Sequence, residues 1–153
     1  MAPRHLMEPL ETTTRTLDST LANIDLAENA ILEFAQRAGF LGTELEKVGL
    51  AVREVVANAI IHGNRLDGQK KVVVTTLRTP DQLEVAVWDQ GMGFDLDCLP
   101  DPRSPDVLLR EHGRGIYLAR AFMDEFHVHT GPAGGTTVSL IKYTRKNRNG
   151  KNQ

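Results

Sequence analysis

The chain has 153 residues, of which 41% are hydrophobic and 25% are charged, and its formal net charge is −2 at pH 7. This size and composition fit one soluble globular domain, and the near-neutral charge gives no reason to expect direct nucleic-acid binding. The single cysteine, Cys98, excludes an internal disulfide and a cysteine-based metal cluster, and fits a reducing, cytoplasmic setting.

The two ends of the chain differ in composition from its centre. The start, MAPRHLMEPLETTTRT, has no apolar run long enough for a signal peptide or a membrane span. The end, RKNRNGKNQ, contains basic residues and no apolar one. We therefore expect a flexible N-terminus at residues 1–9, one folded domain at 10–143 and a flexible basic tail at 144–153.

A short strand and two helices are expected first. The segment ETTTRTL (11–17) is rich in β-branched residues, as strands are. Apolar residues recur at helical spacing through residues 21–39, where Gly39 is a candidate C-terminal cap. Thr43 and Glu46 have the spacing of a capping box, which predicts a second helix from there to about His62.

The second half of the chain predicts strands that pair as hairpins, with a helix at 113–123. The strand patterns are KKVVVTTL (70–77), LEVAVWD (83–89), EFHVHT (125–130) and TTVSLIKYT (136–144). Hairpins in this order predict an α+β fold of two layers, with a mostly antiparallel sheet and helices on one face. Trp88 is expected in the core, and His127 and His129 on a solvated strand face rather than in a metal pair.

Three polar residues interrupt the second helix, in the segment EVVANAIIHGN. Glu54, Asn58 and His62 are four residues apart, so they are expected along one side of the helix. An asparagine oxygen suits magnesium, and a glutamate one turn away suits proton transfer from a hydroxyl. A polar seam at the helix surface is the simpler alternative from these residues alone.

The segment DQGMG follows the strand at 83–89 directly. Asp89 accepts hydrogen bonds and could read an exocyclic amine, while Gly91 and Gly93 let a ligand approach the main chain. Taken alone, an Asp-Gly segment after a strand is more often a turn than a binding site.

The segment HGRGIYLARAF places Gly113 and Gly115 at the start of a helix. Free N–H groups and the helix dipole favour phosphate at such a start, and Arg114 could add a charged contact. A lone Gly-x-Gly is weak evidence, and no parallel βαβ unit begins with it.

In this order and spacing, the three motifs resemble the GHKL superfamily of ATP-binding domains, which share the Bergerat fold. The resemblance covers residues 10–143. Within the superfamily, VREVVANAIIHGN and FMDEFHV are most similar to the anti-sigma-factor serine/threonine kinases. The resemblance implies bound ATP and Mg²⁺, with an ATP site made of Asn58, His62, Asp89, Gly91, Gly93, Arg110, Gly113, Arg114, Gly115 and Thr136.

The resemblance also implies individual roles. Asn58 would hold the magnesium, and Glu54 would be the general base toward a serine or threonine hydroxyl. Asp89 would bind the adenine amino group with help from Thr136. Gly113, Arg114 and Gly115 would cradle phosphates, and residues 95–112 would form a lid over the nucleotide.

One position departs from the family. The relatives have an arginine two residues before the first glycine of the last motif, where this chain has Glu111 between Arg110 and the motif's own Arg114. Either arginine could supply the positive charge near the transferred phosphoryl group.

The activity implied is that of a bacterial protein kinase which binds a sigma factor and phosphorylates its antagonist, and which forms a homodimer. The alternatives are an ATP-binding module that sequesters a partner without phosphoryl transfer, and a histidine-kinase-like ATPase domain. A plain α+β domain whose three motifs coincide by chance is the remaining possibility.

Overall fold

The computed structural model describes residues 8–92 and 111–144, and for residues 111–114 only the course of the backbone. Its strands are β1 (Glu11–Asp18), β2 (Lys71–Arg78), β3 (Gln82–Asp89), β4 (Glu125–Thr130) and β5 (Thr136–Tyr143). Its helices are α1 (Ala22–Arg37), α2 (Gly42–Ala57) and α4 (Glu111–Phe122), and a π-helical segment, η2 (Asn58–Gly63), continues α2. These elements follow one another in the predicted order.

The strands form one antiparallel sheet in the order β1-β2-β3-β5-β4. Alternate residues of β3 and β5 are buried beneath the helices, as the period of a strand requires. The apolar members of this inner face are Leu83, Val85, Val87, Val138 and Leu140. The two strands also bury polar residues on it: Asp89, paired with Thr136, at one end of the sheet, and Lys142 at the other.

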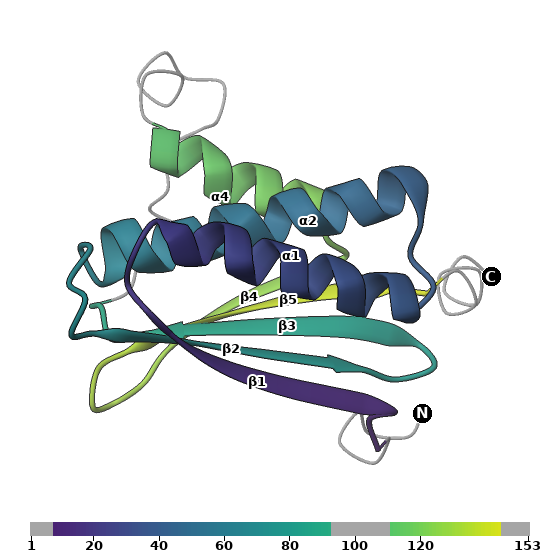
Figure 1. Cartoon of the computed structure of the whole chain (residues 1–153), viewed down its shortest axis with the longest axis horizontal. Coiled ribbons are helices and arrows are strands. Elements are labelled where there is room, and N and C mark those ends of the chain that lie inside the picture. Colours follow the sequence, from purple (N-terminus) through teal and green to yellow (C-terminus); the bar gives the residue numbers. More distant parts are fainter. Residues whose placement is uncertain (1–7, 93–110, 145–153) are drawn as a thin grey trace.

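The helices form a single layer over one face of the sheet (Figure 1). Both α1 and α4 pack against α2. The fully buried side chains of α2 include Val48, Val52, Val55 and Val56. Because burying each valine is worth roughly 1.5–3 kcal/mol relative to leaving it exposed, α2 is firmly anchored. The predicted α+β fold of two layers is confirmed.

One predicted helix end is confirmed and one predicted helix start is wrong. Gly39 has a positive φ of 97° just after the cap of α1, where a helix commonly ends on glycine. The capping box at Thr43 does not form, since α2 begins at Gly42 and the cap residue, Leu41, makes no side-chain hydrogen bond. Gly42 has a φ of 56°, so a glycine turn rather than a side-chain oxygen leads into the helix.

The sheet face away from the helices carries Trp88, which is 37% exposed. The prediction that Trp88 belongs to the core is therefore wrong. His127 and His129 are both exposed and pair with Ser139 and Thr137, which places the two imidazoles on one face as predicted. Among the described residues, no group of three or more potential metal ligands of the His, Cys, Asp and Glu types is found.

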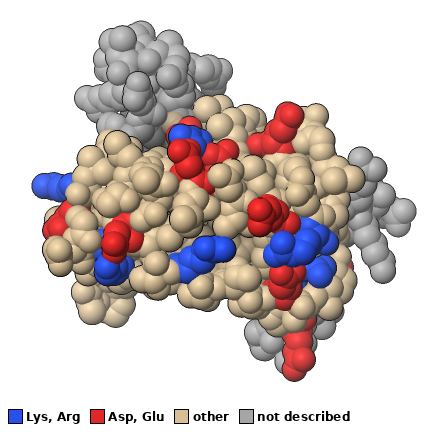
Figure 2. All heavy atoms as spheres, viewed as in Figure 1, with Lys and Arg blue, Asp and Glu red and all other residues tan. Residues whose placement is uncertain are grey.

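The predicted flexible ends lie outside the described residues except for Glu8, Pro9 and Thr144, so the predicted domain limits remain predictions. Within residues 8–92 and 111–144, no helix is both long and apolar enough to cross a membrane. On the face drawn in Figure 2, acidic and basic side chains lie beside one another rather than in a patch of one sign. Ion pairs such as that of Arg37 with Glu11 account for this mixing.

Candidate functional site

The polar row on the second helix spans the change from α-helix to π-helix. Glu54 in α2 and Asn58 at the start of η2 are half-buried, whereas His62 is exposed. Hydrogen bonds in a π-helix join residues five apart, so side chains four apart no longer lie directly above one another. The predicted single row is therefore interrupted: Glu54 and Asn58 share a half-buried environment that His62 does not.

The start of α4 packs directly on Glu54. A Cβ atom added at Gly115 would lie 2.1 Å from the Glu54 Oε2, closer than any real contact, so a larger residue there would displace the Glu54 carboxylate. This contact brings the third motif against the first, as the phosphate-site prediction needs. Gly113 and Arg114 belong to the first turn of α4, where the backbone alone is described.

Asp89 and Thr136 lie opposite each other at the end of the sheet. They are cross-strand partners of β3 and β5, and their exposed fractions are 4% and 1%. The Oγ1 of Thr136 is a buried oxygen without a hydrogen-bond partner among the described residues. A buried polar atom without a partner is costly, and is commonly explained by a ligand, ion or water that completes it.

Among the residues that the structure describes, only one hydrogen bond to the Asp89 carboxylate is found. Its Oδ1 accepts a hydrogen bond of 2.7 Å from the Gly91 N–H. Burial raises the pKa of Asp89, and that hydrogen bond opposes the rise. A carboxylate can accept several hydrogen bonds, so the group has capacity for a further donor.

Gly63 brings the end of η2 against Asp89. A Cβ atom at Gly63 would lie 2.7 Å from the Asp89 Cγ, and one at Gly91 would lie 2.6 Å from the Gly63 carbonyl oxygen. The structure thus joins the first and second motifs through two glycines. Gly63 is not among the site residues predicted from the sequence. Its place at the end of the polar helix segment was the signal that could have identified it.

Asn64 is the second residue that the sequence reading missed. Its side chain is completely buried and hydrogen-bonds to residues at the ends of β1, β2 and β3. In the sequence, the available signal was an asparagine just after a helix. Nothing in the local sequence indicated its burial or its partners.

Several predicted site residues cannot be placed. Gly93 and Arg110 lie outside the described residues, as does Cys98. Of the predicted lid at residues 95–112, only the backbone of the last two positions is described, at the start of α4.

The placed residues form two chemically different ends joined by η2. At Asp89 and Thr136, a carboxylate acceptor lies beside a hydroxyl that lacks a partner, which suits the amino-bearing edge of a purine. At the other end, a carboxylate oxygen of Glu54 lies against Gly115 near the glycine-rich start of α4, and Asn58 follows four residues later at the start of η2. Carboxylate and carboxamide oxygens suit a cation, and a glycine-rich helix start suits phosphate. Because η2 begins at Asn58 and its last residue, Gly63, contacts Asp89, both ends belong to one side of the molecule.

Comparison with known proteins identifies the family of the chain. The family model of the histidine kinase-like ATPase domain matches residues 17–142. The serine-protein kinase RsbW of Bacillus subtilis is 33% identical over 120 residues, which are 74% of each chain. The anti-sigma F factor of Bacillus cereus is 30% identical over 128 residues, covering 77% of this chain and 86% of that one.

A solved structure supports the fold. The RsbW-containing structure of the RsbU and RsbW domains of Rv1364c from Mycobacterium tuberculosis superimposes with a TM-score of 0.63 at 22% identity. The match covers 90% of this chain and 34% of that longer chain. The chain therefore belongs to the family of histidine kinase-like ATPase domains, in the group that contains the RsbW serine-protein kinases and the anti-sigma F factors.

Proposed function

We propose that the protein is an ATP-dependent serine/threonine protein kinase that acts as an anti-sigma factor. It would bind a sigma factor and phosphorylate the antagonist protein that opposes this binding. The observation that carries the proposal is the buried pair of Asp89 and Thr136, beside the end of the segment that begins at Asn58. The Thr136 hydroxyl of this pair has no hydrogen-bond partner in the part of the chain that the structure describes.

The purine end of the proposed site selects adenine. Asp89 accepts a hydrogen bond from the exocyclic amino group, and the Thr136 hydroxyl gains the partner that no described residue supplies. Gly63 and Gly91 let the end of η2 and the turn after β3 pack tightly around the Asp89 carboxylate, because a side chain at either position would collide with Asp89. We expect Gly93 to extend this turn beside the base.

The phosphate end of the proposed site includes the first turn of α4, with Gly113 and Arg114, and Gly115 directly after it. The free N–H groups and the dipole of this helix start favour anions. The carboxamide oxygen of Asn58 is a suitable ligand for Mg²⁺. When bound, the metal would neutralise part of the phosphate charge. Arg114 or Arg110 would provide further positive charge.

Phosphoryl transfer in this site needs mostly positioning and charge stabilisation. Glu54 aligns the hydroxyl of the substrate serine or threonine and accepts its proton. The hydroxyl oxygen forms the new bond to the γ-phosphorus while the bond from that phosphorus to the ADP oxygen breaks. Gly115 fixes the carboxylate by packing on it, so the base is held near the helix start that binds the phosphates.

We further propose a cytoplasmic location, since a sigma factor acts there, and a homodimeric state, which rests on the resemblance to the kinase family. Sedimentation of the purified protein at several concentrations tests the dimer. A single monomeric species throughout the series would refute it.

A second candidate function is ATP binding and partner sequestration without phosphoryl transfer. The observation that favours it is Glu111, an acidic residue where the kinase relatives have an arginine. Less positive charge near the transferred group would lower the rate of transfer more than it would lower nucleotide affinity.

One labelling experiment separates these functions. The protein is incubated with magnesium, γ-³²P-labelled ATP and a candidate antagonist protein, and the label is followed on gels run with and without acid treatment. The kinase proposal predicts acid-stable label on the antagonist, as expected of a serine or threonine ester. ATP binding without label favours sequestration, and acid-labile label on the protein itself favours a histidine-kinase activity.

A further inference from the structure

The chain makes an unusual turn between η2 and β2. The N–H of Asn64 donates to the carbonyl of Ala59 at 2.8 Å, and that of Leu66 donates to Ile60 at 2.9 Å. Arg65 and Leu66 then have φ values of 53° and 58°. Residues other than glycine rarely adopt this left-handed backbone region, and two such residues in succession need support from the surroundings.

That support comes from the side chain of Asn64, which is completely buried. Its Nδ2 donates to the Ser19 Oγ at 2.9 Å and to the Lys71 carbonyl at 3.0 Å. Its Oδ1 accepts the Gln90 N–H at 2.8 Å. The orientation of the amide is settled by chemistry, because a backbone N–H must meet the oxygen and a carbonyl must meet the nitrogen.

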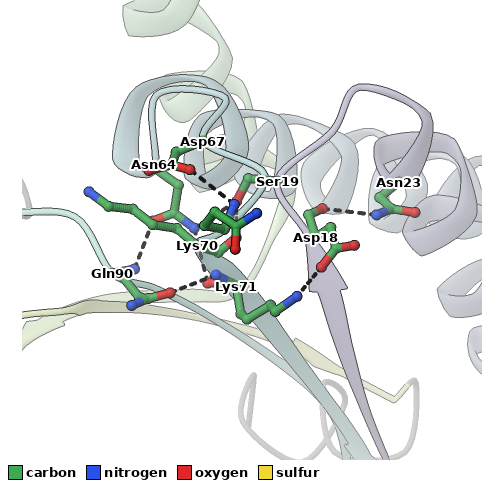
Figure 3. Close-up of polar contacts among 9 residues, drawn as sticks. Asp18, Ser19, Asn23, Asn64, Asp67, Lys70, Lys71 and Gln90 are labelled. Carbon is green, nitrogen blue, oxygen red and sulfur yellow. Dashed lines mark hydrogen bonds and ion pairs between the residues drawn. The ribbon is translucent and has the colours of Figure 1, made fainter.

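The network continues beyond Asn64 (Figure 3). The Ser19 hydroxyl donates to the Lys70 carbonyl at 2.7 Å, and the Lys71 N–H donates to the Gln90 side chain at 2.6 Å. Asn64 thus ties the end of η2 to three other segments: the residue after β1, the start of β2 and the residue after β3.

Each partner in the bond between Asn64 and Gln90 is next to a residue of the purine end. Gly63 precedes Asn64, and Asp89 and Gly91 flank Gln90. Gly63 also lies against both Asp89 and Gly91. The Asn64 side chain therefore fixes how far the end of β3 lies from the end of η2, while its complete burial keeps it from touching a ligand.

We propose that Asn64 is the positioning residue for adenine recognition: its hydrogen bond to Gln90 holds the Asp89 carboxylate in register with Gly63. The inference rests on the proposed ATP site. It assigns the selectivity for the base partly to a residue outside the three motifs, acting through Asp89.

The test compares the affinities of the full chain for ATP and GTP by calorimetry in two alanine variants. Asn64→Ala removes the bond to Gln90. Ser19→Ala is the matched control, since it weakens the same network on the side away from Asp89. Both are measured at a temperature where circular dichroism shows them folded.

We expect Asn64→Ala to lower the preference for ATP over GTP by about fivefold or more, the effect of disturbing roughly one hydrogen bond. Ser19→Ala should keep the wild-type ratio within about twofold, although both variants unfold more easily. A purely structural role would lower the stability of both and leave the ratio unchanged in both. A folded Asn64→Ala protein with the wild-type ratio would therefore overturn the inference.

The wild type separates this inference from the proposed function. Binding of neither nucleotide would refute the ATP site itself, whereas equal binding of ATP and GTP would leave Asn64 no selectivity to set and would overturn the inference.

If Asn64→Ala does not fold, deuterium exchange on the wild type replaces it. ATP should then slow exchange of the Gln90 amide more than GTP does, with the Thr79 amide at the distant hairpin turn as the unaffected control; equal slowing would count against Asn64.

Discussion

The inner face of β3 and β5 buries polar residues at both of its ends, and the two ends treat them differently. At one end, the Lys142 ammonium donates to the Phe122 carbonyl at 2.7 Å and lies 3.1 Å from the Glu44 carboxylate. At the other end, the Thr136 hydroxyl has no hydrogen-bond partner among the described residues, and burial raises the pKa of Asp89. The polar groups at the first end are satisfied within residues 8–92 and 111–144, and the Thr136 hydroxyl at the second end is not.

This difference separates structural polar groups from functional ones within one pair of strands. A buried polar group that completes its bonds inside the protein contributes to the fold. One that lacks a partner costs stability, and that cost is recovered when a ligand supplies the missing bond. Variants at the two ends should therefore affect stability and ATP affinity in opposite patterns.

The largest effect is expected at Glu54, which lies on the functional side of this comparison. Glu54→Gln keeps the shape that packs against Gly115 but cannot accept a proton. Since a positioned general base is worth about 10²- to 10⁴-fold, phosphoryl transfer to the antagonist should fall by that factor, while ATP affinity stays within a few-fold. Initial rates with labelled ATP measure the phosphoryl transfer, and calorimetry measures the ATP affinity. Transfer at the wild-type rate would remove Glu54 from the role of base.

The next largest effect is expected at the satisfied end. Lys142→Met keeps the length of the side chain but leaves the Phe122 carbonyl without its donor and Glu44 without this partner. Leaving one buried group unsatisfied costs about 1–3 kcal/mol, and we expect the free energy of unfolding to fall by that amount. Glu44 adds little because it is partly exposed to water. Urea unfolding measures the loss, and ATP affinity should not change; a folded variant that no longer binds ATP would show that the two ends are coupled.

Thr136→Val reverses this pattern with a smaller effect. Valine has the shape of threonine and removes the hydroxyl that lacks a partner, so the free energy of unfolding should stay within about 0.5 kcal/mol or rise. ATP affinity should fall by about 2- to 10-fold, the value of roughly one hydrogen bond. Thr137→Val is the matched control, because the next residue of β5 lies on the opposite face and pairs with Trp88. Equal ATP affinities for both variants would exclude Thr136 from the site.

The sequence predicted the elements well because their signals are local. Alternation through residues 83–89 predicted a strand, whose Leu83, Val85 and Val87 the fold buries, and Gly39 marked the end of α1. The same alternation puts Trp88 on the outer face, so its prediction as a core residue was wrong: the position in the strand decides the face, and residue type does not. The capping box predicted at Thr43 was wrong because a positive φ at the preceding glycine sets the start of α2, and the sequence does not reveal that angle.

The site was predictable in part, and mostly through the family resemblance. Asp89 and Thr136 are distant in the chain, and only the register of the sheet brings them together. The π-helical turn and the bonds of Asn64 depend on partners from three other segments, so no local pattern encodes them. Contacts between segments that are distant in the chain decide the geometry of the purine end, and residue types alone do not specify these contacts.

The smallest expected effect is a pH dependence at Asp89. Burial raises its pKa in the folded protein above the ordinary value of 3.8, so the native state holds this proton more tightly than the unfolded chain does. As pH rises from below 3.8 through the raised pKa, Asp89 therefore makes the free energy of unfolding fall. In Asp89→Asn this contribution is absent, whereas the other titrating groups are the same in both proteins and cancel in the difference.

Urea unfolding of both proteins without nucleotide, at a series of pH values from about 4 to 7, checks this sign. The wild type should lose stability relative to Asp89→Asn as pH rises, and the difference should then level off. A difference that moves the other way would mean that the protein already stabilises the ionised carboxylate, as it does for the polar groups at the opposite end of the sheet. Asp89 would then belong with the satisfied groups, and the reason to expect a donor from the ligand at this position would be lost.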